Sequence, residues 1–222
     1  MSVATATEWG TRMKPSRRIR LSVGSLLVLV TLLAGFLSWR TMRANEVKRL
    51  QRSIASLDGK IAYRHQLADG KLTKSRNPAV PEVVLDVVGE AWFATPEALL
   101  LDYSPLRDDD LTFLKDVKGI RLISLPSTGI TDAALVHVAS VTELQSLLIY
   151  CTGITDEGIH NLTKLPSLEY LDIRNTKVTD KGMKYLASIP TLKQVCISGT
   201  AITEEGVIEF QAARPDCDVE GW

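Results

Sequence analysis

One segment carries the clearest structural pattern of this chain: Leu144-Gln-Ser-Leu-Leu-Ile-Tyr-Cys-Thr-Gly-Ile-Thr-Asp-Glu-Gly158. Its first half alternates apolar and polar residues as a strand does. The apolar residues that come next, Ile159, Leu162 and Leu165, have the spacing of one helical face. The segment therefore predicts a strand, a turn and a helix, in that order.

The central phrase of this segment recurs at a fixed interval. Copies of Thr-x-Ile/Val-Thr-Asp/Glu begin at Thr128, Thr152, Thr176 and Thr200, which gives a period of 24 residues. The apolar positions on either side recur with it, and a degraded earlier copy begins at Pro96. We therefore expect about five stacked strand–turn–helix repeats.

These units resemble the leucine-rich repeats, whose strand segment reads L-x-x-L-x-L-x-x-N/C-x-L. Residues 144–154 and 168–178 match that pattern, with Thr where Asn or Cys is usual. The resemblance implies an α/β fold, a right-handed leucine-rich-repeat solenoid. We predict parallel strands near 99–101, 123–125, 147–149, 171–173 and 195–197. We predict helices that start near 109, 132, 156, 180 and 204.

The recurring polar residues have structural interpretations. Thr152 and its equivalents should bond the backbone of the turn that leaves the strand. The Thr-Asp after that turn should begin a helix, with Thr155 as its cap and Asp156 placing negative charge in the first turn. Gly158 and its equivalents indicate close packing of the helix against adjacent backbone. The run 108–110, three Asp residues, lacks the alternating oxygen ligands of a calcium loop, so no metal and no cofactor are expected.

The N-terminal region contains a second decisive feature. Leu21 to Trp39 is a run without charge that would span roughly 29 Å as a helix, close to the ~30 Å of a bilayer core. Arginines border it on both sides. We predict a basic tail at 1–20 and a transmembrane signal anchor at 21–39. A cleaved signal is the alternative, but the run exceeds the usual ~7–15 residues and no small-x-small site comes after it.

Charge divides the chain into two regions of opposite sign. Residues 1–60 hold 11 Lys or Arg against 3 Asp or Glu, a balance of +8, and residues 92–222 hold 11 against 19, a balance of −8. A basic region next to the membrane suits anionic lipid headgroups. The acidic repeat region argues against nucleic acid as a partner.

Residues 40–91 are predicted to form a juxtamembrane helix and an N-terminal cap, ahead of a leucine-rich-repeat domain at 92–222. The apolar residues Val47, Leu50, Ile54, Leu57 and Ile61 have the spacing of a coiled-coil seam. The seam covers only about two heptads, fewer than a coiled coil usually sustains. We therefore favour a helix that packs on the repeats over a weak homodimer. Strand-like pieces at 61–63 and 83–88 would complete the cap.

The whole arrangement resembles a group of bacterial single-span membrane proteins with repeats of the Ile-Thr-Asp-x-Gly type. Gly59-Lys-Ile-Ala-Tyr63 and Ile154-Thr-Asp-Glu-Gly158 carry this resemblance. It implies architecture and membrane location more than an activity. Catalytic patterns are absent from the sequence, so we do not expect an enzyme. The three cysteines, Cys151, Cys196 and Cys217, are expected to stay free.

The remaining candidate is a binding surface on the concave side of the sheet. The outward strand positions bring together large aromatic, apolar and charged side chains, which are Tyr103, Leu122, Leu148, Tyr150, Tyr170, Asp172 and Arg174. Tyr and Arg are typical anchors of protein interfaces. The alternative is that Leu122, Leu148 and Tyr150 only support one another across strands.

We therefore expect a membrane-anchored protein that presents this small surface to a protein or peptide ligand at the cell envelope. A self-associating spacer and an accessory subunit of a membrane enzyme are the alternatives. Five basic residues lie on each side of the span, so the positive-inside rule does not decide the orientation. An N-terminal apolar helix usually acts as an export signal for the domain behind it, which favours repeats that face the periplasm or the exterior.

Overall fold

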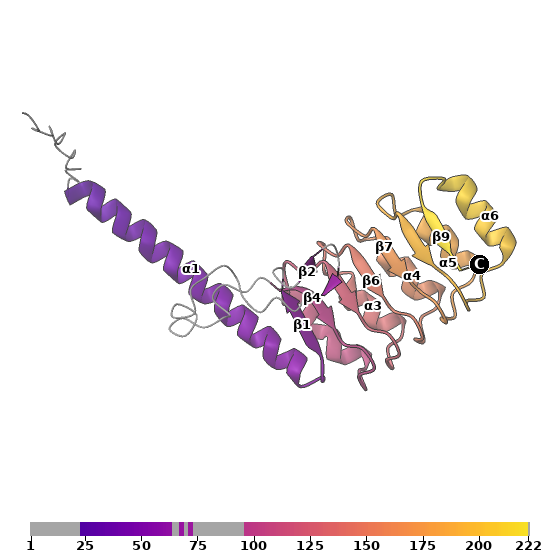
Figure 1. The fold of residues 1–222 in the computed structure, drawn as a ribbon, viewed down its shortest axis with the longest axis horizontal. Coiled ribbons are helices and arrows are strands. Elements are labelled where there is room, and N and C mark those ends of the chain that lie inside the picture. The colour runs from indigo at the N-terminus through magenta and orange to yellow at the C-terminus, as the bar shows by residue number, and fades with distance from the viewer. Residues whose placement is uncertain (1–22, 64–66, 69–70, 73–95, 222) are drawn as a thin grey trace, which may run out of the picture. The chain divides into compact units, whose positions relative to one another are not determined.

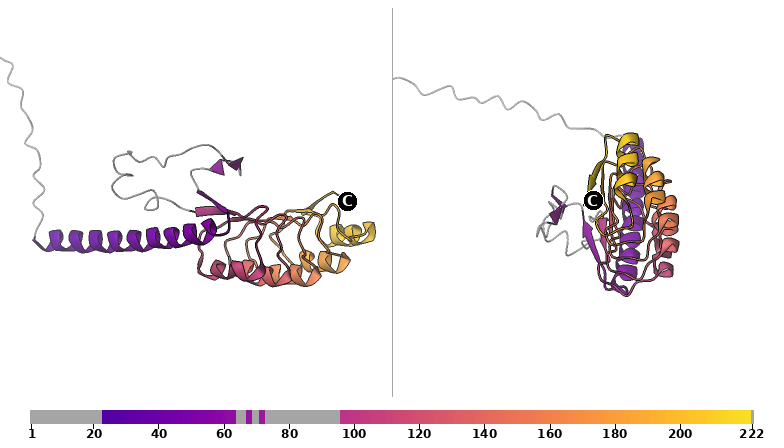
Figure 2. Two further views of the ribbon diagram at one scale, coloured as in Figure 1. Left: turned by 90° about the horizontal axis from the view of Figure 1, so that it is seen from below. Right: turned by 90° about the vertical axis from the view of Figure 1, so that its right-hand side faces the viewer.

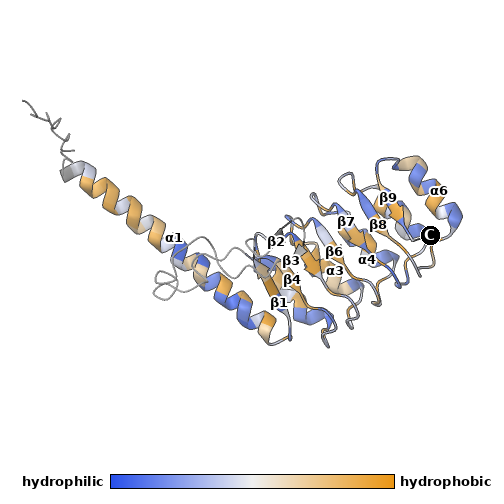
Figure 3. Ribbon diagram, viewed as in Figure 1, coloured by the Kyte–Doolittle hydropathy of each residue, from blue (hydrophilic) through white to orange (hydrophobic). Residues whose placement is uncertain are grey.

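The computed structural model describes residues 23–63, 67–68, 71–72 and 96–221. The chain divides into two compact units, residues 1–39 and residues 40–222. Helix α1 (Val23–Ala55) runs from the first unit into the second. Within the described residues it is the one helix long and apolar enough to cross a membrane. Its first half is apolar and its second half mixes polar with apolar residues (Figure 3). Leu21 and Ser22, the start of the predicted span, lie outside the described residues.

A seven-stranded sheet forms the body of the second unit, in the order β1-β4-β5-β6-β7-β8-β9 (Figure 1). The strands from β4 to β9 are parallel, and each residue pairs with the one 24 positions later, as Ala98 does with Leu122. This register confirms the predicted parallel strands. Their bounds are β1 (Lys60–Tyr63), β4 (Pro96–Leu100), β5 (Leu122–Ser124), β6 (Ser146–Leu148), β7 (Tyr170–Asp172), β8 (Gln194–Cys196) and β9 (Asp218–Glu220).

The strands β5 to β8 begin one residue earlier than the sequence predicted. The prediction relied on the side chains that face the core, such as Ile123 and Leu125, whereas the backbone ladder begins one residue before them. Pairing still continues past the strand end, because the Leu125 N–H donates to the Leu148 carbonyl at 2.8 Å. The predicted register of Val219 with Val195 is confirmed in β9.

The N-terminal edge of the parallel sheet is covered by β1, which pairs antiparallel with β4. Ile61 lies opposite Leu99, so the strand-like piece at 61–63 is confirmed. The other predicted piece, 83–88, lies outside the described residues. A separate antiparallel pair is made by β2 (Leu67–Ala68) and β3 (Lys71–Leu72).

Each crossover between parallel strands contains a helix. The helices are η3 (Asp108–Asp116, a 3-10 helix), α3 (Asp132–Val138), α4 (Asp156–Leu162), α5 (Asp180–Ala187) and α6 (Glu204–Ala213). Their first residues lie within one position of those predicted. Figure 2 shows these helices together along one side of the sheet, while β2 and β3 lie on the opposite side, near its N-terminal end. The arrangement fits the predicted solenoid.

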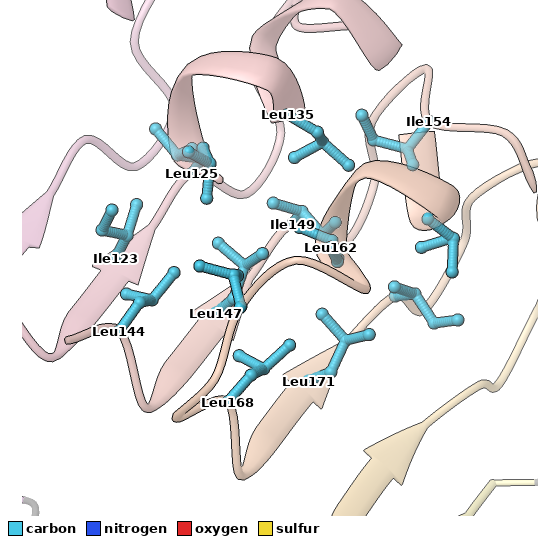
Figure 4. Close-up of a cluster of buried hydrophobic side chains, with 14 of the residues drawn as sticks. Ile123, Leu125, Leu135, Leu144, Leu147, Ile149, Ile154, Leu162, Leu168 and Leu171 are labelled. Carbon is cyan, nitrogen blue, oxygen red and sulfur yellow. The ribbon is translucent and has the colours of Figure 1, made fainter. Parts of the chain in front are cut away.

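The core lies between the sheet and these helices, and it is continuous along the second unit. The middle residue of each strand from β5 to β8 is fully buried, and Leu147 packs between Ile123 and Leu171 (Figure 4). The helices contribute buried residues such as Leu135 and Leu162 from the opposite side. Because each unit buries its apolar residues against its neighbours, no unit has a complete core of its own.

The C-terminal half of α1 belongs to this core. Leu50 and Ile54 pack in the same cluster as the strand residues, and Leu57 and Ile61 lie against it. The Ser104 hydroxyl donates to the Leu57 carbonyl at 2.5 Å, which ties the end of the helix to the turn after β4. Of the two roles considered for the seam, the structure shows packing on the repeats.

The recurring turn threonines bond the backbone, as predicted. Thr128, Thr152 and Thr176 are buried, and their hydroxyls donate to the carbonyls of Leu125, Ile149 and Ile173, each three residues earlier in the same unit. The distances are 2.8, 2.5 and 2.6 Å. These bonds satisfy carbonyls that the end of the strand leaves inside the core.

The Thr-Asp pairs do more than the sequence predicted. Thr155 accepts from the Glu157 N–H as a helix cap, as expected, but Thr131 makes no such bond. Most of the hydrogen bonds of these Thr-Asp pairs join neighbouring units. The Asp156 carboxylate accepts from both the backbone N–H and the hydroxyl of Thr179 in the next unit, at 2.8 and 2.7 Å. The same two bonds link Asp108 to Thr131, Asp132 to Thr155 and Asp180 to Thr203. We call these four joints the Asp–Thr ladder.

The ladder also corrects the interpretation of the recurring glycines. A Cβ atom on Gly182 would lie 2.6 Å from Oδ1 of Asp156, and one on Gly158 or Gly206 would collide with the preceding unit's Asp in the same way. The neighbours that these glycines share are therefore carboxylates, not adjacent backbone, and at Gly182 the Val178 side chain lies as close. In the phrase Ile-Thr-Asp-x-Gly, the Thr donates to the Asp of the preceding unit, and the Asp accepts from the Thr of the next unit. The Gly leaves room for the carboxylate of the preceding unit.

Candidate functional site

The face of the sheet opposite the helices, which we call the open face, carries the predicted partner-binding residues. Strand alternation directs Leu122, Leu148 and Tyr170 to this face, and all three are half-buried. Tyr150 and Arg174 come after β6 and β7 in the same register. Tyr103 comes after β4 and is 73% exposed, more than the other exposed large hydrophobic side chains of the described repeats, Val136 and Ile208.

Asp172 is the one predicted contact residue that does not reach the surface. Its side chain is fully buried, although it lies on the open face, because neighbouring side chains cover it. It accepts from Nε and Nη2 of Arg174 at 2.9 and 2.6 Å, and from the Arg174 backbone N–H at 3.1 Å. This bidentate pair fixes the guanidinium and raises the pKa of Arg174 above its usual value. Asp172 is thus a positioning residue for Arg174.

Arg174 is held against an aromatic ring. Its guanidinium carbon lies 5.3 Å from the centroid of the Tyr150 ring, a cation–π distance. Burial raises the pKa of Tyr150, and the neighbouring Tyr103 side chain raises it further. The Tyr150 hydroxyl therefore keeps its proton at neutral pH and remains a donor. Tyr103 and Arg174 both neighbour Tyr150, so the group offers two neutral hydroxyl donors and one cationic donor.

A second polar group lies toward the C-terminal end of the open face. The Tyr170 hydroxyl and the Cys196 thiol are 3.4 Å apart, and that thiol lies 3.5 Å from Oε2 of Glu220. Oε1 of Glu220 accepts from Gln194 at 2.6 Å. Burial raises the pKa of Tyr170. The sequence analysis missed Glu220, although the 24-residue period places it directly after Cys196 in the ladder of strands.

The residue after each strand exit has a left-handed backbone, a feature that the sequence analysis also missed. Positive φ values occur at Tyr103 (57°), Ser127 (54°), Cys151 (57°), Asn175 (53°) and Gly199 (72°), again 24 residues apart. Asn and Gly accept this conformation readily, but a bulky Tyr does so only with strain on the order of 1–3 kcal/mol. Tyr103 therefore combines a strained backbone conformation with a highly exposed side chain.

The described residues contain no group of three or more His, Cys, Asp or Glu side chains that could hold a metal ion. All three cysteines are free, as predicted; Cys151 is exposed, and Cys196 and Cys217 are buried. What the open face offers is a set of fixed aromatic and polar side chains, an arrangement suited to recognition.

Comparison with known proteins gives a local match and distant structural likenesses. Residues 164–187 match the family model described as Leucine Rich repeat. A leucine-rich-repeat protein of Leptospira interrogans aligns at 17% identity and TM-score 0.37, over 48% of this chain and 32% of that one. Internalin C2 of Listeria monocytogenes aligns at 22% identity and TM-score 0.37, over 49% of this chain and 54% of that one. No curated protein matches.

This chain spans less than two thirds of each of those two structures. The matched residues cover the C-terminal part of one unit and the strand and helix of the next, which pair in the 24-residue register of the whole sheet. Residues 164–187 are thus similar to a leucine-rich repeat, and the units on either side share their register.

Proposed function

We propose that this protein is anchored in a membrane by α1 and presents the open face of its repeats to a protein or peptide ligand at the cell envelope. The observation that carries the proposal is the group of Tyr103, Tyr150 and Arg174, in which the Arg is fixed by a buried carboxylate and one Tyr is held in a strained backbone. Leucine-rich-repeat domains generally bind proteins, and Tyr and Arg are the side chains that dominate such interfaces.

The surface is small, which limits affinity. Of the seven strands, the five from β4 to β8, at ~4.8 Å spacing and with about seven residues each at ~3.3 Å, give on the order of 550 Å² of sheet. A standard interface covers about 800 Å² on each partner. A single copy should therefore bind modestly, and tethering in a membrane would compensate by raising the effective concentration.

The binding proposal predicts a cross-link that depends on position. A photoreactive amino acid at Tyr150, introduced into the full chain in its native membrane, should capture a defined partner. The matched control is Val136, which is 55% exposed on α3, on the opposite side of the repeats. Cross-links that are equally strong at Val136, or that join only two copies of this chain, would contradict the proposal.

Anchoring by α1 is supported by its exposed apolar side chains. Leu26, Leu29, Leu33 and Phe36 are all about half exposed or more, and no part of the described structure covers them. Burial in lipid would remove that surface from water. We place the repeats in the periplasm or outside the cell, with the N-terminus inside.

Cysteine labelling tests this orientation. Cys151 is exposed, whereas burial raises the pKa of Cys196, and that of Cys217 to about 11, so these two thiols should react slowly. A membrane-impermeant maleimide added to intact cells should therefore label Cys151. The variant Cys151→Ser should stay unlabelled. Labelling of Cys151 only after lysis would place the repeats in the cytoplasm.

The spacer alternative has less support. Self-association through residues 44–61 was expected to use the apolar seam, but Leu50 and Ile54 of that seam are committed to the core of their own chain. A dimer would have to use another face of the helix. An accessory role in a membrane enzyme remains compatible with the open face, because such a role also requires a binding surface.

A further inference from the structure

One carboxylate at the edge of the open face, that of Asp102, lacks a basic partner among the described residues. Asp102 comes after β4, is exposed, and accepts from the Ser124 hydroxyl at 2.5 Å. No basic side chain of the described residues forms an ion pair with it. Three other acidic groups in or next to the strands are paired: Glu97 with Arg121 at 3.2 Å, Glu169 with Lys193 at 2.8 Å and Asp172 with Arg174 at 2.6 Å.

The surroundings of Asp102 distinguish it from other unpaired acids such as Glu220. Tyr103 is its direct neighbour in sequence, and Tyr150 lies close enough for both Asp102 and Tyr103 to act on it. Tyr103 has a left-handed backbone, and its side chain is 73% exposed. Ser124 fixes one carboxylate oxygen and leaves the other free to accept.

The open face already holds one cationic group, the guanidinium of Arg174. Arg174 sits over the Tyr150 ring and uses both oxygens of Asp172, so a carboxylate and an aromatic ring hold one guanidinium together. Asp102 and Tyr103 repeat these two components without the guanidinium. The repeat region, with its balance of −8 over residues 92–222, would also attract a basic partner over longer range.

We propose that Asp102, Tyr103 and Tyr150 form a site for one cationic side chain, Arg or Lys, of the partner protein. This inference rests on the proposed function, because it specifies the chemistry of the ligand that the open face takes. The carboxylate supplies a charge-assisted hydrogen bond, and the exposed Tyr103 ring supplies cation–π attraction. An Arg suits the site best, since its planar group can bond the carboxylate and stack on a ring at once.

The test uses the full chain in nanodiscs of zwitterionic lipid, with ¹³C in the tyrosine rings. The probe is N-acetyl-arginine methylamide, and its neutral control is N-acetyl-citrulline methylamide, which has nearly the same shape. Of the five tyrosines, those at 103 and 150 should shift with the arginine probe in the millimolar range, and Tyr185 on α5 should not. The citrulline probe should cause little shift at any tyrosine, and added salt should weaken the arginine response.

Two variants keep the result interpretable. Asp102→Asn preserves the shape and the bond with Ser124, and should weaken the arginine response about fivefold. Tyr103→Asn removes the ring and relaxes the left-handed backbone, so misfolding cannot explain a similar loss. The control Asp109→Asn removes an exposed charge in η3 and should leave the response unchanged. Equal responses to arginine and citrulline, or no change in Asp102→Asn, would overturn the site.

The result of the probe-binding test can be distinguished from the result of the cross-linking test of the proposed function. If Tyr150 captures a partner in membranes but the arginine probe does not bind, the open face is an interface without this cation site. If the probe binds as described and no partner is captured, the site's chemistry stands and the proposed function fails.

Discussion

Leu147→Asp should leave no cooperatively folded repeat domain. The Leu147 side chain is fully buried between Ile123 and Leu171, in the middle of the sheet. Truncating a buried Leu alone costs about 2–5 kcal/mol, and a buried unpaired carboxylate adds to that cost. The sum approaches the whole stability of an ordinary domain, ~5–15 kcal/mol. Circular dichroism with urea titration of the purified chain should show loss of the cooperative transition.

The adjacent residue gives the matched control. Ser146 lies in the same strand, is half-buried and points to the open face. Ser146→Asp adds the same charge one position earlier and should change the free energy of unfolding by no more than about 1 kcal/mol. A folded Leu147→Asp chain with the wild-type urea midpoint would disprove the packing between units described above.

Asp156→Ala should lower the free energy of unfolding by about 2–4 kcal/mol, since hydrogen bonds to charged groups contribute ~1.5–3 kcal/mol each and this site is partly open to water. The substitution removes both bonds of Asp156 to Thr179, and it leaves the Thr179 backbone N–H without its partner in the preceding unit. Urea denaturation at neutral pH measures the loss.

Glu204→Ala is the control for the Asp–Thr ladder. Glu204 occupies the same position of the last copy, is exposed, and has no Thr of a later unit among the described residues. Its replacement should change the free energy of unfolding by less than about 0.5 kcal/mol. Equal losses in the two variants would mean that Asp156 acts only through the charge it places at a helix start, as the sequence first suggested.

Much of the fold could be predicted because one period governs the repeat region. A 24-residue repeat that alternates strand and helix spacing forces equivalent residues such as Leu147 and Leu171 side by side, so the register could be obtained by counting. Parallel pairing, the helix starts and the turn threonine bonds were confirmed for that reason. The first helix of the repeats is a 3-10 helix rather than an α-helix, which periodicity does not distinguish.

The contacts between units were harder to predict, because each joins two residues that occupy different positions of the repeat and belong to different copies. Asp156 was interpreted within its own helix, whereas its partner Thr179 lies 23 residues later. The spacing from each Asp to the next unit's Thr is constant, and that regularity was the available signal. Strand alternation placed Asp172 correctly on the open face, but not its burial, which depends on the side chains that cover it.

The Asp–Thr ladder also sets which changes of length this chain can tolerate. Every joint has the same spacing of 23 residues, from Asp108 to Thr131 through to Asp180 to Thr203. Removing or duplicating one whole 24-residue unit therefore reconnects each carboxylate to an equivalent threonine and glycine. A shorter insertion in a single turn disturbs only the joint it interrupts. Such a change would lengthen or shorten the open face by one strand and leave β1 and β9, at the two edges of the sheet, unchanged.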